Sequence, residues 1–428
     1  MPLDNLSSGI AHSGRTQLAV RVRRITHMTR ILIVGGGVAG AVTALALAKA
    51  GYDPELFEAY ETSPEHRGSY LTVAVNGLSA LYAVDAVDVV NGVGFAAPSI
   101  AFYLGDGRKL NEVKVGGSLP DGTATRSVRR GELHARLLDE VRRRSIPVHT
   151  GKRLKALDEK ATGVTAYFAD GTSATGDLLV GADGVHSTVR RLILPEFATA
   201  PYTGLINIGG FSPAAGLGLA PGEHWMVFGR RAFFGCAVEP GGDVWWFANL
   251  GRKEAVTRED LEHTDDARWK ALLADVFARD RSPARAVVAA SGPVTVSNSY
   301  EVPDLPVWHT SRIVLAGDAA HAASPAAGQG ASMAMEDSVV LAQCLRDLPT
   351  PEAAFRTFQE LRRPRARRVT AQGARASKFK AVGPIQRRIR DRKLPALLAG
   401  HASGGEHSLA WIYEHRVSWD TRVEAHSG

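Results

Sequence analysis

The chain has 428 residues, of which 45% are hydrophobic and 22% charged, as expected for a soluble globular protein with one large or two closely packed domains. Two cysteines, Cys236 and Cys344, exclude a disulfide framework, and no metal-ligand spacing is present, so we expect no metal and a cytoplasmic location. Much of the net charge of +7 comes from residues 362–393, which contain thirteen Lys or Arg and one acid, Asp391. We interpret them as a solvated helical region packed on the body of the protein. Attraction of an anionic coenzyme or lipid surface is the alternative, and no interleaved aromatic residues support nucleic-acid binding.

Residues 1–28 form a polar leader that we expect to be disordered, and Met28 is an alternative start. The arginines near its end precede an uncharged run, 31–48, which imitates a signal peptide. We reject that interpretation because the run contains a glycine turn that a folded domain needs. No other long apolar run occurs, so we expect no transmembrane segment.

A strand, a glycine turn and an alanine-rich helix follow in residues 31–50 and predict a dinucleotide-binding unit. In this G-x-G-x-x-G pattern Gly35 permits the tight turn, Gly37 admits the pyrophosphate, and Gly40 lets helix and strand pack closely. The helix N-terminus supplies amides and partial positive charge. Glu58 ends the next apolar run, where a ribose hydroxyl would bind. The residues assigned to the dinucleotide here are Gly35, Gly37, Val38, Ala39, Gly40 and Glu58.

Further elements are predicted from periodicity. Residues 76–78 open a short helix, 100–114 form a hairpin, and 130–144 form a helix with one apolar face. The region 191–309 is rich in β-strand patterns, with its clearest hairpin at 231–247. The aromatic residues of that hairpin are either ordinary sheet core or the lining of a substrate pocket.

The segment 176–190 is a buried strand that ends in a turn carrying an acid. It resembles the D-x-x-x-G-A-D-G-x-x-S-x-x-R motif of the class A FAD-dependent monooxygenases, the aromatic hydroxylases of the p-hydroxybenzoate hydroxylase-like superfamily. The resemblance implies that this segment, and Asp183 in particular, serves FAD and the transient docking of NAD(P)H. The matching residues are Asp177, Gly181, Ala182, Asp183, Gly184, Ser187 and Arg190.

A third segment, 312–337, looks like the same family's GD motif. The resemblance implies that Asp318 binds the ribityl chain of FAD and that Pro325 and Gly328 form the flavin-peroxide environment. A helix that starts near Gly330 would direct its N-terminal dipole at the flavin. Ser332 stands where many relatives have Asn, which a backbone contact would tolerate, and His321 is interpreted as structural. The cofactor-binding residues implied here are Asp318, Gly328, Gly330, Ala331 and Ser332.

Two arginines complete the candidate site. Arg130 fits the family's R-x-x-L helix, whose Arg faces the FAD; Arg129 is the competing candidate, and a solvated surface Arg is the alternative. Arg67 fits the loop after the Glu58 strand, where an Arg often reaches the pyrophosphate or coenzyme.

The expected fold is α/β, with a Rossmann-like FAD-binding domain of the p-hydroxybenzoate hydroxylase type, an inserted β-sheet substrate domain and a C-terminal helical region. The FAD-binding domain is discontinuous. It comprises residues 29–72, 126–190 and 310–348, the substrate domain comprises 73–125 and 191–309, and the basic helical region comprises 349–428.

The resemblance implies that NADPH or NADH reduces FAD and that O2 adds to give a flavin hydroperoxide. This species would hydroxylate or epoxidise an electron-rich aromatic or polyketide-like small molecule. Two alternatives are a reductase of the geranylgeranyl type and a non-catalytic binding protein on the FAD fold. The presence of both Asp183 and Asp318 in full motifs argues against the latter.

Overall fold

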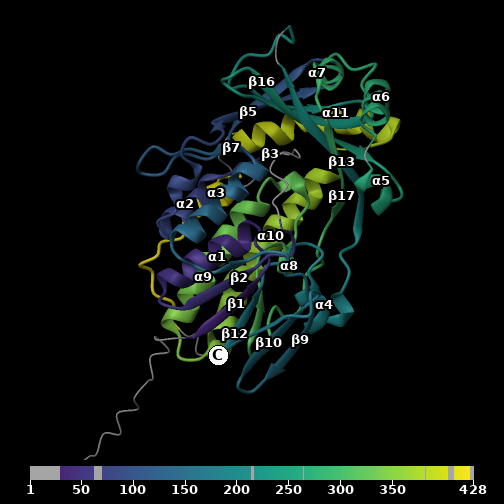
Figure 1. Cartoon of the computed structure of the whole chain (residues 1–428). Helices are drawn as coiled ribbons and strands as arrows, with labels where there is room; N and C mark the ends of the chain where they lie inside the picture. The colour runs from purple at the N-terminus through teal and green to yellow at the C-terminus, as the bar shows by residue number, and fades with distance from the viewer. Residues whose placement is uncertain are drawn as a thin grey trace, which may run out of the picture.

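The computed structural model describes residues 29–61, 70–213, 216–263, 265–380, 382–402 and 409–424. The expected leader, 1–28, and Arg67 lie outside these residues. Two sheets organise the chain: a parallel sheet in the lower part of Figure 1 and a large sheet in its upper part, with the helix α10 between them.

The parallel sheet has the order β18-β12-β1-β2-β8. Its strands are β1 (Arg30–Val34), β2 (Asp53–Phe57), β8 (Val148–His149), β12 (Leu178–Gly181) and β18 (Ile313–Leu315). The short apolar runs of β1, β12 and β18 are buried, as parallel strands covered on both faces require. Because β1 lies between β12 and β2, their carboxyl ends meet where the chain turns into the first helix.

Helices cover one face of this sheet and an antiparallel meander covers the other (Figure 1). The helices are α1 (Val38–Lys49), α3 (Arg130–Arg143) and α9 (Gly330–Asp347), and the meander comprises β9 (Leu154–Lys160), β10 (Gly163–Phe168) and β11 (Ser173–Gly176). The predicted helix at 130–144 is confirmed as α3, with its four predicted apolar residues buried. The predicted helix start at Gly330 is also confirmed.

The large sheet has the order β17-β13-β16-β15-β14-β5-β6. Its strands are β5 (Ser99–Leu104), β6 (Lys109–Lys114), β13 (Tyr202–Pro213), β14 (His224–Phe228), β15 (Ala232–Val238), β16 (Asp243–Gly251) and β17 (Val294–Tyr300). Both predicted hairpins, 100–114 and 231–247, are confirmed. Side-chain alternation directs Phe234 and Trp246 to a core under α6 (Asp266–Val276) and α7 (Ala284–Ala290). Phe233, Trp245 and Phe247 belong to the opposite face, which we call the inner face.

A small antiparallel sheet, β3 (Tyr70–Val73), β7 (Arg126–Arg129) and β4 (Phe95–Ala96), leads from the inner face toward α9. The helix after β3, α2 (Val75–Ala83), packs on α9, and its apolar residues share the core of the parallel sheet. Gly77 permits this approach, because a Cβ there would lie 2.7 Å from Ser332 Oγ. We therefore propose that residues 73–93 belong with the parallel sheet rather than with the expected substrate domain.

The C-terminal region is helical, as α10 (Pro351–Ser377), α11 (Pro384–Ala402) and α12 (Ala410–Tyr413). It packs against the body of the protein as expected: Leu394 of α11 joins a cluster on the inner face. The expectation that its charges are solvated is wrong for Arg362, Lys380 and Arg390, which are buried. No helix among the described residues is long and apolar enough to cross a membrane. The remaining short elements are η1 (Val87–Val90), α4 (Thr188–Ile193), η2 (Pro195–Phe197), α5 (Arg258–Glu262), α8 (Asp318–His321) and η3 (Pro325–Ala327).

Candidate functional site

In the turn after β1, close packing requires glycine at two positions, and at a third position the glycine borders open space. Gly35 has φ +104°, and a Cβ there would lie 2.5 Å from the carbonyl oxygen of Ala182. A Cβ at Gly40 would lie 1.8 Å from the carbonyl oxygen of Gly35. A Cβ at Gly37, by contrast, would meet no described atom within 4 Å, and the residue is exposed. The turn therefore presents free space at the position where the sequence pattern expects a pyrophosphate.

The first turn of α1 offers backbone amides to that space. The first helical bond runs from Ala41 N to Gly37 O, at 3.0 Å, so the amides of Val38, Ala39 and Gly40 have no acceptor within the helix. No acidic residue lies in the first turn. This arrangement suits an anion.

Glu58 lies directly beside the glycine turn. Its carboxylate accepts hydrogen bonds from the amides of Gly36, at 2.7 Å, and Tyr60, at 3.0 Å. On the other side of the turn, His134 Nε2 donates to the carbonyl oxygen of Gly36 at 2.8 Å. No motif in the sequence indicates His134. Its four-residue spacing from Arg130, which places both residues on one side of α3, is the pattern that could have identified it.

Asp183 holds its own turn. One carboxylate oxygen accepts from Ser187 Oγ at 2.5 Å, and the other accepts from the amides of Thr188 and Val189 at 2.7 and 3.1 Å. Burial raises the pKa of Asp183. These bonds fix the turn whose backbone packs on Gly35, so they indicate a positioning role, and the predicted contact of Asp183 with the cofactor stays a prediction.

Arg190 connects this turn to the Asp318 segment. Its buried guanidinium donates to the carbonyl oxygens of Val185, Phe197 and Ala319, at 2.7, 3.0 and 2.9 Å. The two motifs are therefore physically joined, although 129 residues separate Arg190 from Ala319.

Asp318 begins α8 immediately after β18 and Gly317. Gly317 has φ +60°, and a Cβ there would lie 2.9 Å from Ala39 Cβ on α1. The Asp318 carboxylate is open to solvent and accepts no hydrogen bond from the described residues. Desolvation by surrounding protein atoms raises its pKa, while the positive charges of His321 and Arg130 act against this rise. Asp318 is therefore ready to accept hydrogen bonds from a ligand.

The same electrostatic contact distinguishes the two candidate arginines. Arg130 is exposed and acts on Asp318. Arg129 instead stacks on Phe211 and Trp245, with its guanidinium carbon 4.5 and 5.1 Å from their ring centroids. The geometry favours Arg130 as the arginine on the cofactor side.

The segment between α8 and α9 is also open. Gly328 has φ +61°, and a Cβ there would meet no described atom within 4 Å. A Cβ at Gly330 would meet only Asp318 Oδ1, at 3.8 Å. The first helical bond of α9 runs from Met333 N to Gln329 O, so the three preceding amides have no helical acceptor. Ser332 directs its hydroxyl inward, where it accepts from Ala74 N at 3.1 Å; this leaves only its backbone for a ligand.

A buried ionic network lies beneath this opening. Asp337 of α9 contacts His321 Nε2 at 2.5 Å, Arg362 Nε at 2.7 Å and the amide of Gly317 at 3.0 Å. Arg362 also contacts Glu336 at 2.7 Å, and Arg365 of α10 pairs with Glu336 at 2.7 Å. The contact of His321 with Asp337 supports its predicted structural role. Neither arginine is a site candidate from the sequence, because a run of basic residues predicts solvated side chains.

This network predicts a definite dependence of stability on pH. Burial alone would raise the pKa of Asp337, but His321 and Arg362 hold it at about 2. Burial would lower the pKa of His321, but Asp337 raises it overall. The contribution of Asp337 is therefore present above pH 3.8 and lost as the pH falls through about 2. The contribution of His321 is present below pH 6.5 and lost as the pH rises through its raised pKa.

We therefore expect both contributions in full between about pH 4 and 6.5. Urea unfolding as a function of pH tests this. In a His321→Gln variant the decline above pH 6.5 should flatten; an unchanged alkaline limb would contradict the role given to His321.

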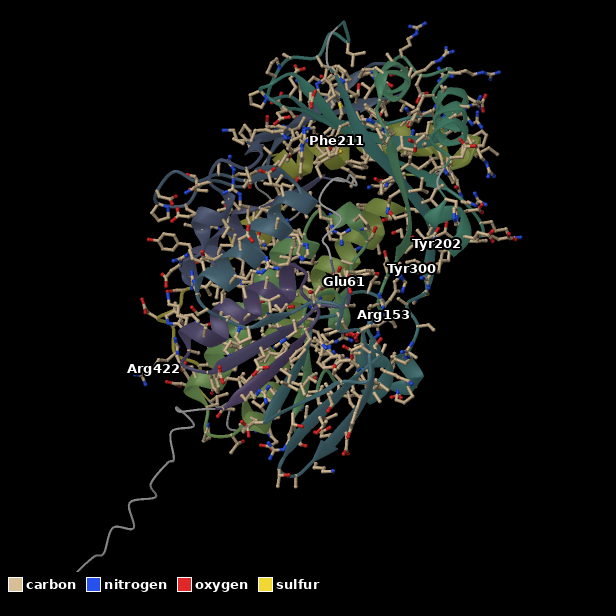
Figure 2. All side chains as sticks on the ribbon, in the orientation of Figure 1. Glu61, Arg153, Tyr202, Phe211, Tyr300 and Arg422 are labelled. Atoms are coloured by element: carbon tan, nitrogen blue, oxygen red, sulfur yellow. The ribbon has the colours of Figure 1, made fainter. Side chains whose placement is uncertain are left out.

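The inner face of the large sheet approaches the site from the other side. Tyr70 of β3 lies 6.0 and 5.9 Å, centroid to centroid, from Trp245 and Phe247. Four residues further on, Ala74 bonds to Ser332 at the start of α9. The strand β3 therefore connects the aromatic inner face to the N-terminus of α9. Figure 2 labels Phe211, which packs with Trp245 on this face, in the upper part of the molecule.

Comparisons with known proteins agree with this geometry. Residues 28–373 match the family model described as FAD binding domain. The chain is 31% identical over 353 residues to the FAD-dependent urate hydroxylase of Klebsiella pneumoniae, covering 79% of this chain and 87% of the relative. It is 30% identical over 411 residues to the 3-amino-4-hydroxybenzoate 2-monooxygenase of Streptomyces cremeus, covering 90% and 94%. Its fold matches the crystal structure of Klebsiella pneumoniae HpxO complexed with FAD and uric acid with a TM-score of 0.75 and 25% identity, covering 89% of this chain and 97% of that chain.

The residues present fit FAD. The space at Gly37 and at Gly328 is what a dinucleotide and a flavin ring would occupy, and the carboxylate of Asp318 lacks the donors that ribityl hydroxyls would supply. The fold predicted from the motifs is confirmed. The chain therefore belongs to the FAD-binding family of class A flavin-dependent monooxygenases, enzymes that use FAD with NAD(P)H.

Proposed function

We propose that this enzyme inserts one oxygen atom of O2 into an electron-rich aromatic ring. NAD(P)H supplies two electrons, the ring C–H becomes C–OH, and the second oxygen atom leaves as water. The observation that supports this most strongly is the open FAD cradle at Gly37, Asp318 and Gly328, which β3 connects to the aromatic inner face. Bound FAD, once reduced, supplies the activation of O2.

The side chains divide the remaining tasks. The turn at Gly37 and the first amides of α1 would bind the pyrophosphate, and Glu58 would accept from the ribose. Asp318 and Arg130 would bind the ribityl side, and the first amides of α9 would stabilise negative charge on the flavin. Pro325 and Gly328 would border the reacting edge. Catalysis then rests on positioning and on the local field.

Exclusion of water falls to the inner face. Trp245 is 1% exposed and Phe233 4% exposed. A ring bound against this dry face would be shielded from solvent, which limits the competing release of H2O2. The relatives' names support a conjugated ring as substrate, since they specify urate and an aminohydroxybenzoate. A polyketide-like ring system fits the same requirement.

Anaerobic stopped-flow reduction by NADPH, with and without phenolic and heteroaromatic compounds, tests the proposal. A substrate should accelerate flavin reduction manyfold and, under oxygen-18 gas, yield a product with one labelled atom. Compound-independent reduction without labelled product would contradict it and favour a reductase.

Replacing Asp318 by alanine should weaken FAD binding about tenfold to a hundredfold, because hydrogen bonds to a carboxylate contribute about 1.5–3 kcal/mol. Fluorescence titration of the apoprotein with FAD measures the Kd. Asp139→Ala, at an exposed carboxylate on α3, is the matched control and should leave the Kd unchanged. Equal Kd values for the two variants would exclude Asp318 from the site.

A further inference from the structure

Lys380 is a buried cation on the inner face of the large sheet. It follows α10, is 7% exposed, and donates from Nζ to Asn249 Oδ1 at 2.6 Å. The same Nζ lies 4.4 and 5.6 Å from the ring centroids of Phe233 and Phe247. Asn249 is oriented for this contact, because its Nδ2 donates to Asn207 Oδ1 at 2.5 Å.

Other buried cations of the described chain have stronger partners. Arg362 pairs with two carboxylates, Arg390 pairs with Asp391 and donates to carbonyl oxygens, and Arg190 donates to three carbonyl oxygens. Lys380 has one neutral amide oxygen, and no carboxylate of the described residues forms an ion pair with it. Burial accordingly lowers the pKa of Lys380 to about 7. A buried ammonium without a carboxylate partner is costly, so an anion that bound beside Lys380 would stabilise its charged form.

The Lys380 end of α10 packs on the loop assigned to the flavin. Lys380 N bonds to Ser377 O at 3.0 Å, and Ser377 Oγ lies 2.5 Å from Ser324 Oγ, immediately before Pro325. One turn earlier on α10, a Cβ at Gly373 would lie 3.0 Å from Ala327 Cβ. From the sheet side, Phe247 contacts both Lys380 and Tyr70, whose buried hydroxyl has no partner among the described residues. These contacts place Lys380 between the inner face and the loop that contains Ser324 and Ala327.

We propose that Lys380 binds the ionised oxygen of an acidic aromatic substrate, a carboxylate or a phenolate, and thereby selects such substrates over neutral rings. This rests on the proposed function. The ammonium would form a charge-assisted hydrogen bond with the substrate in a site of low polarity, where such a pair is strong. Asn249 holds the ammonium on the inner face, beside Phe233 and Phe247.

The described side chains that contact Lys380 are uncharged. Phe233 comes from β15, Phe247 and Asn249 come from β16, and Ser377 comes from α10; none of these is charged. On the adjoining α11, Arg390 donates to the carbonyl oxygen of Phe379 and pairs with Asp391. Anion binding should therefore protonate Lys380 itself. At about pH 8, binding of a carboxylate should take up about one proton.

Calorimetric titration of the oxidised holoenzyme, in two buffers of different ionisation enthalpy, tests this. The probes are benzoate and 4-hydroxybenzoate against their neutral amides, and phenol. The acids should bind more tightly than the amides with proton uptake; phenol should bind without net uptake but with phenolate absorbance. Those two signatures distinguish a carboxylate ligand from a phenolate.

In Lys380→Met the acids should bind about tenfold to a hundredfold more weakly and without proton uptake, while amide binding stays unchanged. Lys380→Arg should restore affinity for the acids without proton uptake. Lys378→Met, at an exposed lysine of the same turn, is the matched control and should match the wild type. Retained FAD content and melting temperature confirm that the variants fold.

Equal affinities of wild type and Lys380→Met for the acids would overturn the proposal, as would failure of the acids to bind at millimolar concentration. Because these are binding measurements, they fail independently of the proposed function. If oxygen-18 labelling succeeds on neutral rings while Lys380→Met binds acids normally, the oxygenation stands and the role of Lys380 falls.

Discussion

Replacing Asp337 by alanine is expected to lower the free energy of unfolding by about 3–5 kcal/mol, because it breaks a buried ion pair and leaves its partners behind. The side chains of both partners, His321 and Arg362, are largely buried, at 10% and 2% exposed. The amide of Gly317 also loses its acceptor. Denaturant unfolding of the apoprotein measures the loss without interference from FAD.

A matched control is a carboxylate whose arginine partners, like Arg362, lie on α10. Asp304 pairs with Arg363 and Arg367 at 3.0 and 2.7 Å, but these side chains are 25–60% exposed. Asp304→Ala should therefore change the free energy of unfolding by at most about 1 kcal/mol. Similar losses in the two variants would mean that burial does not distinguish the pairs and would contradict the structural role given to Asp337.

Replacing Gly37 by valine should weaken FAD binding more than a hundredfold, while the apoprotein loses only about 1 kcal/mol of stability because Val is a poorer N-cap than Gly. A Cβ at Gly37 meets no described atom within 4 Å, and the backbone there has φ −65°, outside the left-handed region that favours glycine. The added methyl groups would instead occupy the space of the pyrophosphate and separate it from the amides of α1. Hydrogen bonds to a charged group contribute about 1.5–3 kcal/mol each, so loss of two exceeds a hundredfold. Fluorescence titration with FAD and urea unfolding provide the two readouts.

Substitutions at two further glycines serve as controls for this experiment. Gly241→Val, at another open glycine far along the chain, should leave both FAD affinity and stability unchanged. Gly40→Ala should reduce both, since its Cβ would collide with the backbone of Gly35. If Gly37→Val bound FAD normally, the pyrophosphate would have to lie elsewhere.

The sequence predicts those parts of the site whose backbone conformation depends on residues only a few positions apart. Gly35 and Gly40 are needed wherever a strand turns directly into a tightly packed helix, so their spacing alone predicts the turn. The same holds for the start of α9 at Gly330. In each case the constraint acts within a few residues, and the pattern therefore records it.

The parts that could not be predicted depend on partners far away in the chain. Arg362 lies 25 residues from Asp337, and Lys380 lies 131 residues from Asn249. A run of basic residues indicates charge but not burial, so the sequence predicts solvated side chains for Arg362 and Lys380, which are in fact buried. His134 and its acceptor Gly36 are 98 residues apart and belong to no shared motif. Tertiary packing alone brings these groups together.

The order in which the parallel sheet is assembled has a consequence for synthesis. Strand β1 emerges from the ribosome first, but its neighbour β12 and the edge strand β18 follow much later. Thr43 on α1 forms a hydrogen bond with Ser338 on α9, a residue that is synthesised 295 residues later. Nine residues of α1 are buried in the finished fold, and the part of the helix that packs on α9 stays uncovered until then, roughly 15–60 s at ordinary elongation rates. The nascent chain must therefore be shielded from aggregation before it can acquire its flavin.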